Sequence, residues 1–174
     1  GGGIRSIDDF HQVLRAGADK VSVNSAAVLR PELIREAAER FGNQCVVLSI
    51  DAKRDNHGSW QVYVEGGRKN TGIDAMAWAK QGVALGAGEI CMNSMDADGE
   101  KAGFDLELNR RLATELPVPI IASGGAGKMD DFKELFLNHP RVDAGLAASI
   151  FHTKQVDIRD LKLYLRENGV EMRV

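Results

Sequence analysis

Short apolar runs alternate with longer amphipathic segments along the chain. In the amphipathic segments, apolar side chains recur every three or four positions, which predicts helices after Ser6 and Pro31 and over residues 105–116 and 157–168. The apolar runs are flanked by turn residues, as buried parallel strands are, at residues 20–24, 45–51, 89–94, 120–123 and 145–150. This alternation predicts an α/β fold with a parallel sheet, formed by a single domain of residues 1–174.

The connection after Asp51 is longer than the others and has a strand pattern of its own. Residues 60–65 alternate apolar and polar positions, and an Asn-His-Gly turn at 56–58 precedes them. This pattern predicts a small hairpin inserted after a strand. Loops at the carboxyl ends of strands carry the chemistry in α/β folds, so we expect the hairpin to lie beside the functional site.

A repeated motif sets the scale of the fold. The sequence GGGIRSIDDF at residues 1–10 returns as SGGAGKMDDF at residues 123–132, so Phe10 corresponds to Phe132 at an offset of 132 − 10 = 122 residues. A βα unit takes roughly 30 residues, so this offset equals about four units, or half of a (β/α)8 barrel of about 250 residues. We therefore expect a partial (β/α)8 TIM barrel that comprises strands 4 to 8 with their helices and is truncated on its amino-terminal side.

Composition narrows the class of protein. The chain of 174 residues is 44% hydrophobic and carries a formal charge of −3, without the basic field that nucleic acid or anionic membranes attract. No apolar run approaches the roughly 18 residues of a membrane span. Cys45 and Cys91 lie in apolar runs without a CxxC partner, which favours two buried thiols in a reduced, cytoplasmic protein. The four histidines share no ligand spacing, so we expect no metal and no cofactor.

Asp51 is the first candidate for chemistry. It ends the apolar run CVVLSI, which would deliver its carboxylate to the carboxyl edge of the sheet. Removing a carboxylate from water costs free energy, so such a group serves either catalysis or an ion pair. The residues alone leave both open: an acid/base group, or a salt bridge with Lys53 or Arg54.

Glycine pairs suggest two phosphate clamps. Glycines let backbone N–H groups approach an anion, and barrels often bind phosphate between the loops after their last two strands. The rear clamp is expected from residues that follow two neighbouring strands, Gly124, Gly125, Ala148 and Ser149, and its repeat-related front clamp from Gly2, Gly3, Asn24 and Ser25. We expect the rear clamp to be the more intact and to bind phosphate first, because both of its strands are present.

Two further pairs of residues have ordinary interpretations. Asp98 and Gly99, in the sequence MDADG, form a metal loop or, more commonly, a polar turn. Lys20 and Glu89 begin strands, so they are expected as solvated charges at the opposite, amino-terminal mouth of the sheet.

Several motifs, in the right order, resemble the cyclase subunit of imidazole glycerol phosphate synthase, a lyase of histidine biosynthesis. They are GGGI, ADKVSVNSAA, SIDAKR, KNTG, GAGEI, DADGEKAGFD, IIASGGAGKMDDF and LAASIFH. The resemblance implies that Asp51 is a general acid/base, and that Lys20 and Glu89 belong to a gate for ammonia from a glutaminase subunit at the amino-terminal face. It also implies that the groups near substrate and phosphates include Gly3, Asn24, Ser25, Asp98, Gly99, Ser123, Gly124, Gly125, Ala148 and Ser149.

The implied reaction joins ammonia to a bisphosphorylated ribulosyl aminoimidazole substrate and releases imidazole glycerol phosphate and aminoimidazole carboxamide ribotide. From the resemblance we expect that the first three strands of the family, with a first-strand aspartate, are absent from this chain. We therefore expect the isolated chain to be inactive and its open strand edges to self-associate. A non-catalytic phosphate-binding or assembly fragment and the sister isomerase of the pathway remain alternatives, although SIDAKR, KNTG and DADG favour the cyclase.

Overall fold

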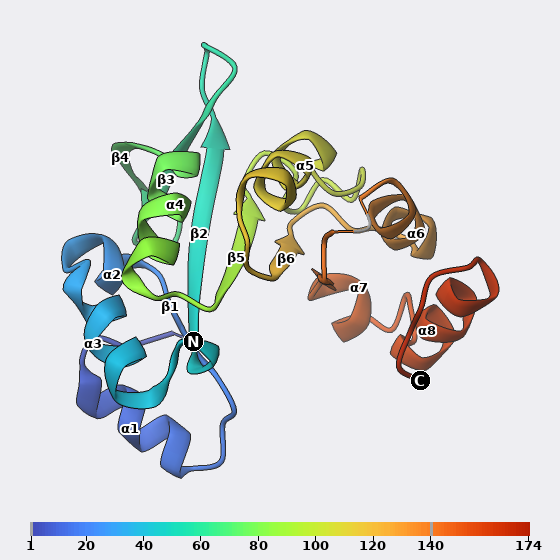
Figure 1. Ribbon diagram of the computed structural model, residues 1–174. Coiled ribbons are helices and arrows are strands. Elements are labelled where there is room, and N and C mark those ends of the chain that lie inside the picture. The colour runs from blue at the N-terminus through green and yellow to red at the C-terminus, as the bar shows by residue number, and fades with distance from the viewer. Residues whose placement is uncertain (1, 140) are drawn as a thin grey trace.

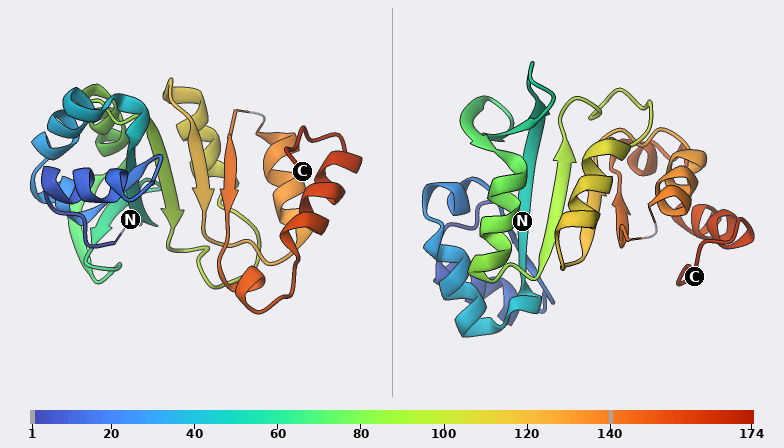
Figure 2. Two further views of the ribbon diagram at one scale, coloured as in Figure 1. Left: turned by 90° about the horizontal axis from the view of Figure 1, so that it is seen from below. Right: turned by 45° about the horizontal axis from the view of Figure 1, so that its top comes forward.

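The computed structural model describes residues 2–139 and 141–174, in which helices and strands follow one another around an arc (Figures 1 and 2). Neighbouring strands of the sheet run parallel in the order β1, β2, β5, β6, β7. The bounds of these strands are Val21–Val23, Val46–Arg54, Glu89–Ser94, Ile120–Ser123 and Ala144–Leu146. The parallel α/β sheet predicted from the hydrophobic pattern is therefore confirmed.

Helices separate the parallel strands along the chain. They are α1 (Ile7–Arg15), α2 (Ser25–Leu29), α3 (Glu32–Phe41), the 3-10 turn η1 (Asn43–Cys45), α4 (Ala75–Leu85), α5 (Leu106–Glu115), α6 (Met129–Asn138), α7 (Ser149–His152) and α8 (Ile158–Glu167). The side chains of β2 that face these helices are fully buried at Val46, Leu48, Ile50 and Ala52. On the opposite face of β2, Ser49 and Asp51 are only partly buried, so the polar groups share the helix-free face of the sheet.

The hairpin predicted after Asp51 is present as β3 (Trp60–Val64) and β4 (Lys69–Asp74). It pairs antiparallel with the carboxyl half of β2, while the amino half of β2 pairs with β1. Strand β2 is consequently longer than predicted and continues to Arg54, because the hairpin supplies backbone partners beyond the parallel sheet. Asp51 lies inside this strand and not at its end.

The other predicted strands and helices agree only in part with those of the structure. The strands at 89–94 and 120–123 are confirmed, whereas the strand expected at 145–150 is wrong beyond Leu146, since α7 begins at Ser149. Helix α4 was not predicted, because its exposed positions include the apolar residues Ala77 and Ala84, which weakens the contrast with the buried face. Neither cysteine is a fully buried strand thiol: Cys45 ends η1, and Cys91 on β5 is partly exposed.

The internal repeat is a structural repeat. Helix α1, strand β1 and helix α2 correspond in order to α6, β7 and α7. Asp9 Oδ2 accepts from the N–H groups of Arg5 (2.8 Å) and Ser6 (2.9 Å). Asp131 Oδ2 accepts from the N–H groups of Gly127 (2.7 Å) and Lys128 (3.0 Å) in the same way. The repeated Asp-Asp-Phe therefore closes a helix start and anchors it with a buried phenylalanine, Phe10 or Phe132.

Candidate active site

A row of polar side chains crosses the carboxyl half of the parallel sheet. Asn24 directly follows β1, Asp51 lies in β2, Asn93 in β5 and Ser123 at the end of β6. The register places Asp51 opposite Asn93, and Asn93 opposite Ser123, on neighbouring strands. Strand pairing thus brings together residues that are up to a hundred positions apart in the sequence.

The carboxylate of Asp51 is held from both sides. Asn24 Nδ2 donates to its Oδ2 at 2.9 Å, and Asn93 Nδ2 donates to its Oδ1 at 3.1 Å. The salt bridge considered for Asp51 does not form among the described residues, because Arg54 pairs with Glu107 at 2.7 Å. The carboxylate is therefore oriented by neutral amides and keeps lone pairs for a proton, as an acid/base group requires.

The front clamp opens on a cavity of about 880 Å³. The residues of the expected front clamp, Gly2, Gly3, Asn24 and Ser25, all line this cavity. A side chain at Gly2 or Gly3 would meet no atom within 4 Å, so the backbone there is open to a ligand. The cavity is large enough for a phosphorylated small molecule.

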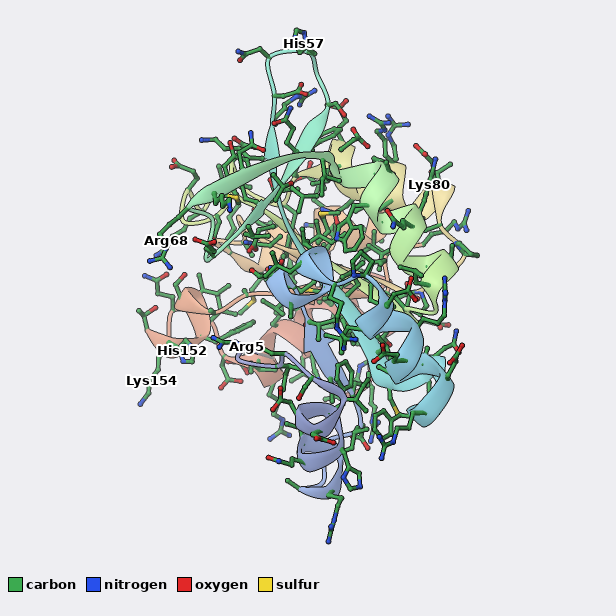
Figure 3. All side chains as sticks on the ribbon, turned by 90° about the vertical axis from the view of Figure 1, so that its left-hand side faces the viewer. Arg5, His57, Arg68, Lys80, His152 and Lys154 are labelled. Atoms are coloured by element: carbon green, nitrogen blue, oxygen red, sulfur yellow. The ribbon has the colours of Figure 1, made fainter. Side chains whose placement is uncertain are left out.

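Arginines also line the front cavity, which the sequence analysis did not anticipate. They are Arg5, Arg30 and Arg68. Arg30 is paired with Glu36 at 2.7 Å, whereas Arg5 and Arg68 lie on the same side of the molecule in Figure 3. Guanidinium groups match phosphate geometry, so the front clamp has cationic as well as backbone donors.

The tip of the hairpin, the turn between β3 and β4 at residues 65–68, reaches the front clamp. The N–H of Glu65 donates to Ser25 Oγ at 3.1 Å, and Arg68 Nε donates to the carbonyl oxygen of Glu65 at 2.8 Å. At its base, Trp60 is fully buried and donates from Nε1 to Asp105 Oδ2 at 3.2 Å. The hairpin is thus anchored against α5 and contributes to the wall of the cavity.

The rear clamp is closed by the loop after β5. Gly124 and Gly125 are buried, and a Cβ on Gly125 would lie 2.0 Å from the carbonyl oxygen of Gly103. Gly103 also donates its N–H to the carbonyl of Gly125 at 2.9 Å. Ala148 and Ser149 are exposed at the start of α7. The front glycines therefore border open space and the rear glycines are covered, while the expected order of phosphate binding stays a prediction.

The remaining predicted residues lie at the two edges of the sheet. Asp98 and Gly99 are exposed in the loop after β5, where the N–H of Asp98 donates to the carbonyl of Ser94 at 2.9 Å. This is the polar turn, and the described residues contain no group of three or more His, Cys, Asp or Glu that could hold a metal. Lys20 and Glu89 form an ion pair at the strand starts, on the edge opposite Asp51.

Burial raises the pKa of the Cys91 thiol to about 11, so this cysteine is a thiol and not a thiolate near neutral pH.

Among the residues that the structure describes, no helix has the length and apolar character to cross a bilayer.

Asn93 is the main site residue that sequence reasoning missed. Its signal is a polar side chain inside the strand CMNS, at the register of Asp51. The alternation of apolar and polar residues assigns Asn93 only to a strand. The pairing of β2 with β5 is needed to show that its hydrogen-bond partner is Asp51. The arginines of the front cavity were missed because they lie far apart in the sequence, and only the folded chain brings them to one cavity.

Parallel strands separated by helices, with a carboxylate and glycine loops at their carboxyl edge, define an α/β protein of the kind that binds small substrates at that edge. Comparison with known proteins agrees: the family described as histidine biosynthesis protein matches residues 1–157. Imidazole glycerol phosphate synthase subunit HisF of Oceanobacillus iheyensis is 58% identical over 99% of this chain and 67% of its own length.

Similar proteins with the same name occur in Streptococcus mutans, at 56% identity over 99% of this chain and 68% of the relative, and in Geobacillus thermodenitrificans, at 57% over 99% and 69%. The chain belongs to the histidine biosynthesis protein family and, within it, to the group of imidazole glycerol phosphate synthase subunits HisF.

Proposed function

We propose that this protein is the cyclase subunit of imidazole glycerol phosphate synthase. It uses ammonia from a glutaminase subunit to convert a bisphosphorylated ribulosyl aminoimidazole carboxamide nucleotide into imidazole glycerol phosphate and aminoimidazole carboxamide ribotide. The observation that carries the proposal is the identity of 56 to 58% to HisF subunits over 99% of the chain. A biosynthetic enzyme of this kind is expected in the cytoplasm.

Asp51 is the proposed acid/base group of the ring closure. Its two oxygens accept from Asn24 and Asn93, which orients the carboxylate toward the helix-free face of the sheet. Ring closure requires protons to leave the attacking nitrogen and to reach leaving groups, and a positioned carboxylate can exchange them. Asp98 and Gly99, in the exposed loop after β5, are proposed to contact the substrate from above this carboxylate.

The two ends of the substrate are proposed to occupy the two clamps. Gly3, Asn24 and Ser25 offer backbone and side-chain donors to one phosphate in the open front cavity. The rear clamp comprises Ser123, Gly124, Gly125, Ala148 and Ser149. Because the loop carrying Gly103 covers its glycines, we propose that this loop moves when the second phosphate binds.

The ion pair of Lys20 and Glu89 supports the proposed route of ammonia. It lies at the amino-terminal edge, opposite the edge that carries Asp51, so the two sites are at opposite mouths of the sheet. We propose that the glutaminase docks on this face and that the pair belongs to the gate.

We further propose that the five parallel strands are strands 4 to 8 of a (β/α)8 barrel. Their order along the sheet follows their order in the chain, as it does in such a barrel. Among the described residues β1 pairs only with β2, and β7 only with β6. Free strand edges favour self-association. Light scattering should show a mass above one chain, and a monomer at high concentration would contradict it.

The function is tested by ammonia-dependent turnover. The chain is assayed alone and mixed with a fragment of the Oceanobacillus iheyensis relative that supplies the part this chain does not match. We expect little product from the chain alone and measurable product from the mixture. Asp51→Asn should abolish that product, whereas Asp8→Asn, on the exposed first turn of α1, should preserve it. Product formation by the Asp51→Asn mixture would overturn the role of Asp51, and absence of product from the unaltered mixture would overturn the function.

A further inference from the structure

Asn93 lies between the carboxylate of Asp51 and the hydroxyl of Ser123. Its Nδ2 is 3.1 Å from Asp51 Oδ1, and its Oδ1 is 3.2 Å from Ser123 Oγ. The three residues face one another across neighbouring strands β2, β5 and β6. The amide therefore has a hydrogen-bond partner at each end, both presented by the sheet.

The chemistry of the partners determines how the amide is turned. A carboxylate oxygen only accepts, so the NH₂ group of Asn93 must face Asp51 and its carbonyl oxygen must face Ser123. The hydroxyl of Ser123 can rotate to donate to that carbonyl oxygen. A flipped amide would place two acceptors against each other at Asp51, so the side chain has one favourable orientation.

Asn24, on the other side of Asp51, is held less firmly. It follows β1 as the residue before α2, and its buried Oδ1 has no hydrogen-bond partner among the residues that the structure describes. Its amide is thus fixed at one end only. Asn93 is part of a strand that is paired on both sides and is fixed at both ends of its side chain. Of the two amides, Asn93 is therefore the better suited to hold Asp51 in one orientation.

The rear glycine loop packs against Asn93. A Cβ on Gly124 would lie 3.0 Å from Asn93 Oδ1 and 2.5 Å from the carbonyl oxygen of Ser94. Little space remains for the amide to leave Asp51. We propose that Asn93 is a positioning residue, which holds the Asp51 carboxylate for proton transfer and is itself held by Ser123. This inference rests on the proposed function, because it gives Asn93 a role in the reaction of Asp51.

The first test observes Asp51 directly and requires no turnover. In chain labelled with ¹³Cγ-aspartate, the NMR signal lost in Asp51→Asn identifies Asp51. Asn93→Leu, which keeps the branched shape of the side chain but removes the donor, is expected to shift this signal. Cys91→Ser, two residues earlier on the same face of β5, is the matched control and should leave the signal in place. An Asp51 signal unmoved in Asn93→Leu, or moved equally in Cys91→Ser, overturns the proposal.

A second variant covers the case in which Asn93→Leu does not fold. Ser123→Ala keeps Asn93 but removes the group that holds its carbonyl oxygen, so the Asp51 signal should move less than in Asn93→Leu but more than in Cys91→Ser. No movement in Ser123→Ala would contradict the role of Ser123 as the anchor of the amide.

The kinetic test separates positioning from substrate binding. In the mixture that supports turnover, Asn93→Leu should lower kcat by on the order of 10- to 100-fold and change KM less than about twofold, because a displaced catalytic group slows chemistry rather than binding. A rise in KM with unchanged kcat would overturn the proposal. If the unaltered mixture makes no product, the proposed function fails while the NMR comparison still decides whether Asn93 holds Asp51.

Discussion

The two copies of the repeat share one plan but differ in what surrounds their glycines. In the front copy, a Cβ at Gly2 or Gly3 would touch nothing within 4 Å, and the glycines border the large cavity. In the rear copy, a Cβ at Gly125 would lie 2.0 Å from the carbonyl oxygen of Gly103. The same sequence feature therefore leaves room for a ligand in one half and allows two loops to pack in the other.

This difference shows that a glycine motif is ambiguous until its neighbours are known. The helix starts are alike, because Asp9 and Asp131 close them with the same pair of backbone hydrogen bonds. What differs is the element that lies over each glycine pair. The loop after β5 covers the rear copy, whereas the tip of the hairpin, at Glu65, only borders the front copy.

The largest expected effect is on stability. Gly125→Ala should destabilise the protein by about 3 kcal/mol or more, because the methyl group combines a positive φ of 104° with a backbone overlap. Gly3→Ala, with a φ of 87° and open space, should lose only about 1 kcal/mol. Urea unfolding of both variants measures the difference. Equal losses would remove the structural distinction between the copies.

The two capping aspartates should differ as well. Asp131→Ala should lower the free energy of unfolding by about 2 kcal/mol, because the Asp131 side chain is buried and its loss leaves the part-buried N–H groups of Gly127 and Lys128 without their acceptor. Asp9→Ala should have a smaller effect, since Asp9 is only partly buried and water can replace its carboxylate at the exposed hydrogen bond from the N–H of Arg5. Thermal unfolding compares the two, and a larger loss in Asp9→Ala would contradict the assigned burial.

Phosphate affinity tests which clamp is open. Ser25→Asp places a negative charge at the front cavity and should weaken the binding of inorganic phosphate by about tenfold, which corresponds to about 1.4 kcal/mol. Ser149→Asp should change the affinity of the first phosphate by less than about threefold, because the rear glycines are covered. Isothermal titration calorimetry gives both values. A stronger effect of Ser149→Asp would restore the order expected from the sequence.

The smallest expected effect is on the stability of the protein at acid pH, through Asp9 at the start of α1. The N–H of Arg5 is the main group that lowers the pKa of the Asp9 carboxyl below its usual 3.8. A lowered folded-state pKa gives stability that is complete above the unfolded value and is lost as pH falls through the folded value. Asp9→Asn should therefore flatten the loss of stability below about pH 4, measured by denaturant midpoints. An unchanged slope would show that Asp9 does not contribute to it.

Features that depend on neighbouring residues could be predicted from the sequence. The helix starts at Asp105 and Asp157 follow from side chains that accept backbone N–H groups two or three residues ahead. The strands at 89–94 and 120–123 follow from short apolar runs between turns. Asp51 could be selected as a candidate because a carboxylate after an apolar run is costly to bury.

Features that depend on register and on loops far apart in the sequence were decided by the tertiary structure. The length of β2 depends on the hairpin that pairs beyond Asp51, and the contact of Asn93 with Asp51 depends on the alignment of β2 with β5. The burial of Gly125 depends on Gly103, in a loop that follows a different strand. A local pattern encodes backbone preference and which face is apolar. The partner of each polar group is known only when the strands are paired, because that pairing brings side chains distant in the sequence within hydrogen-bond distance.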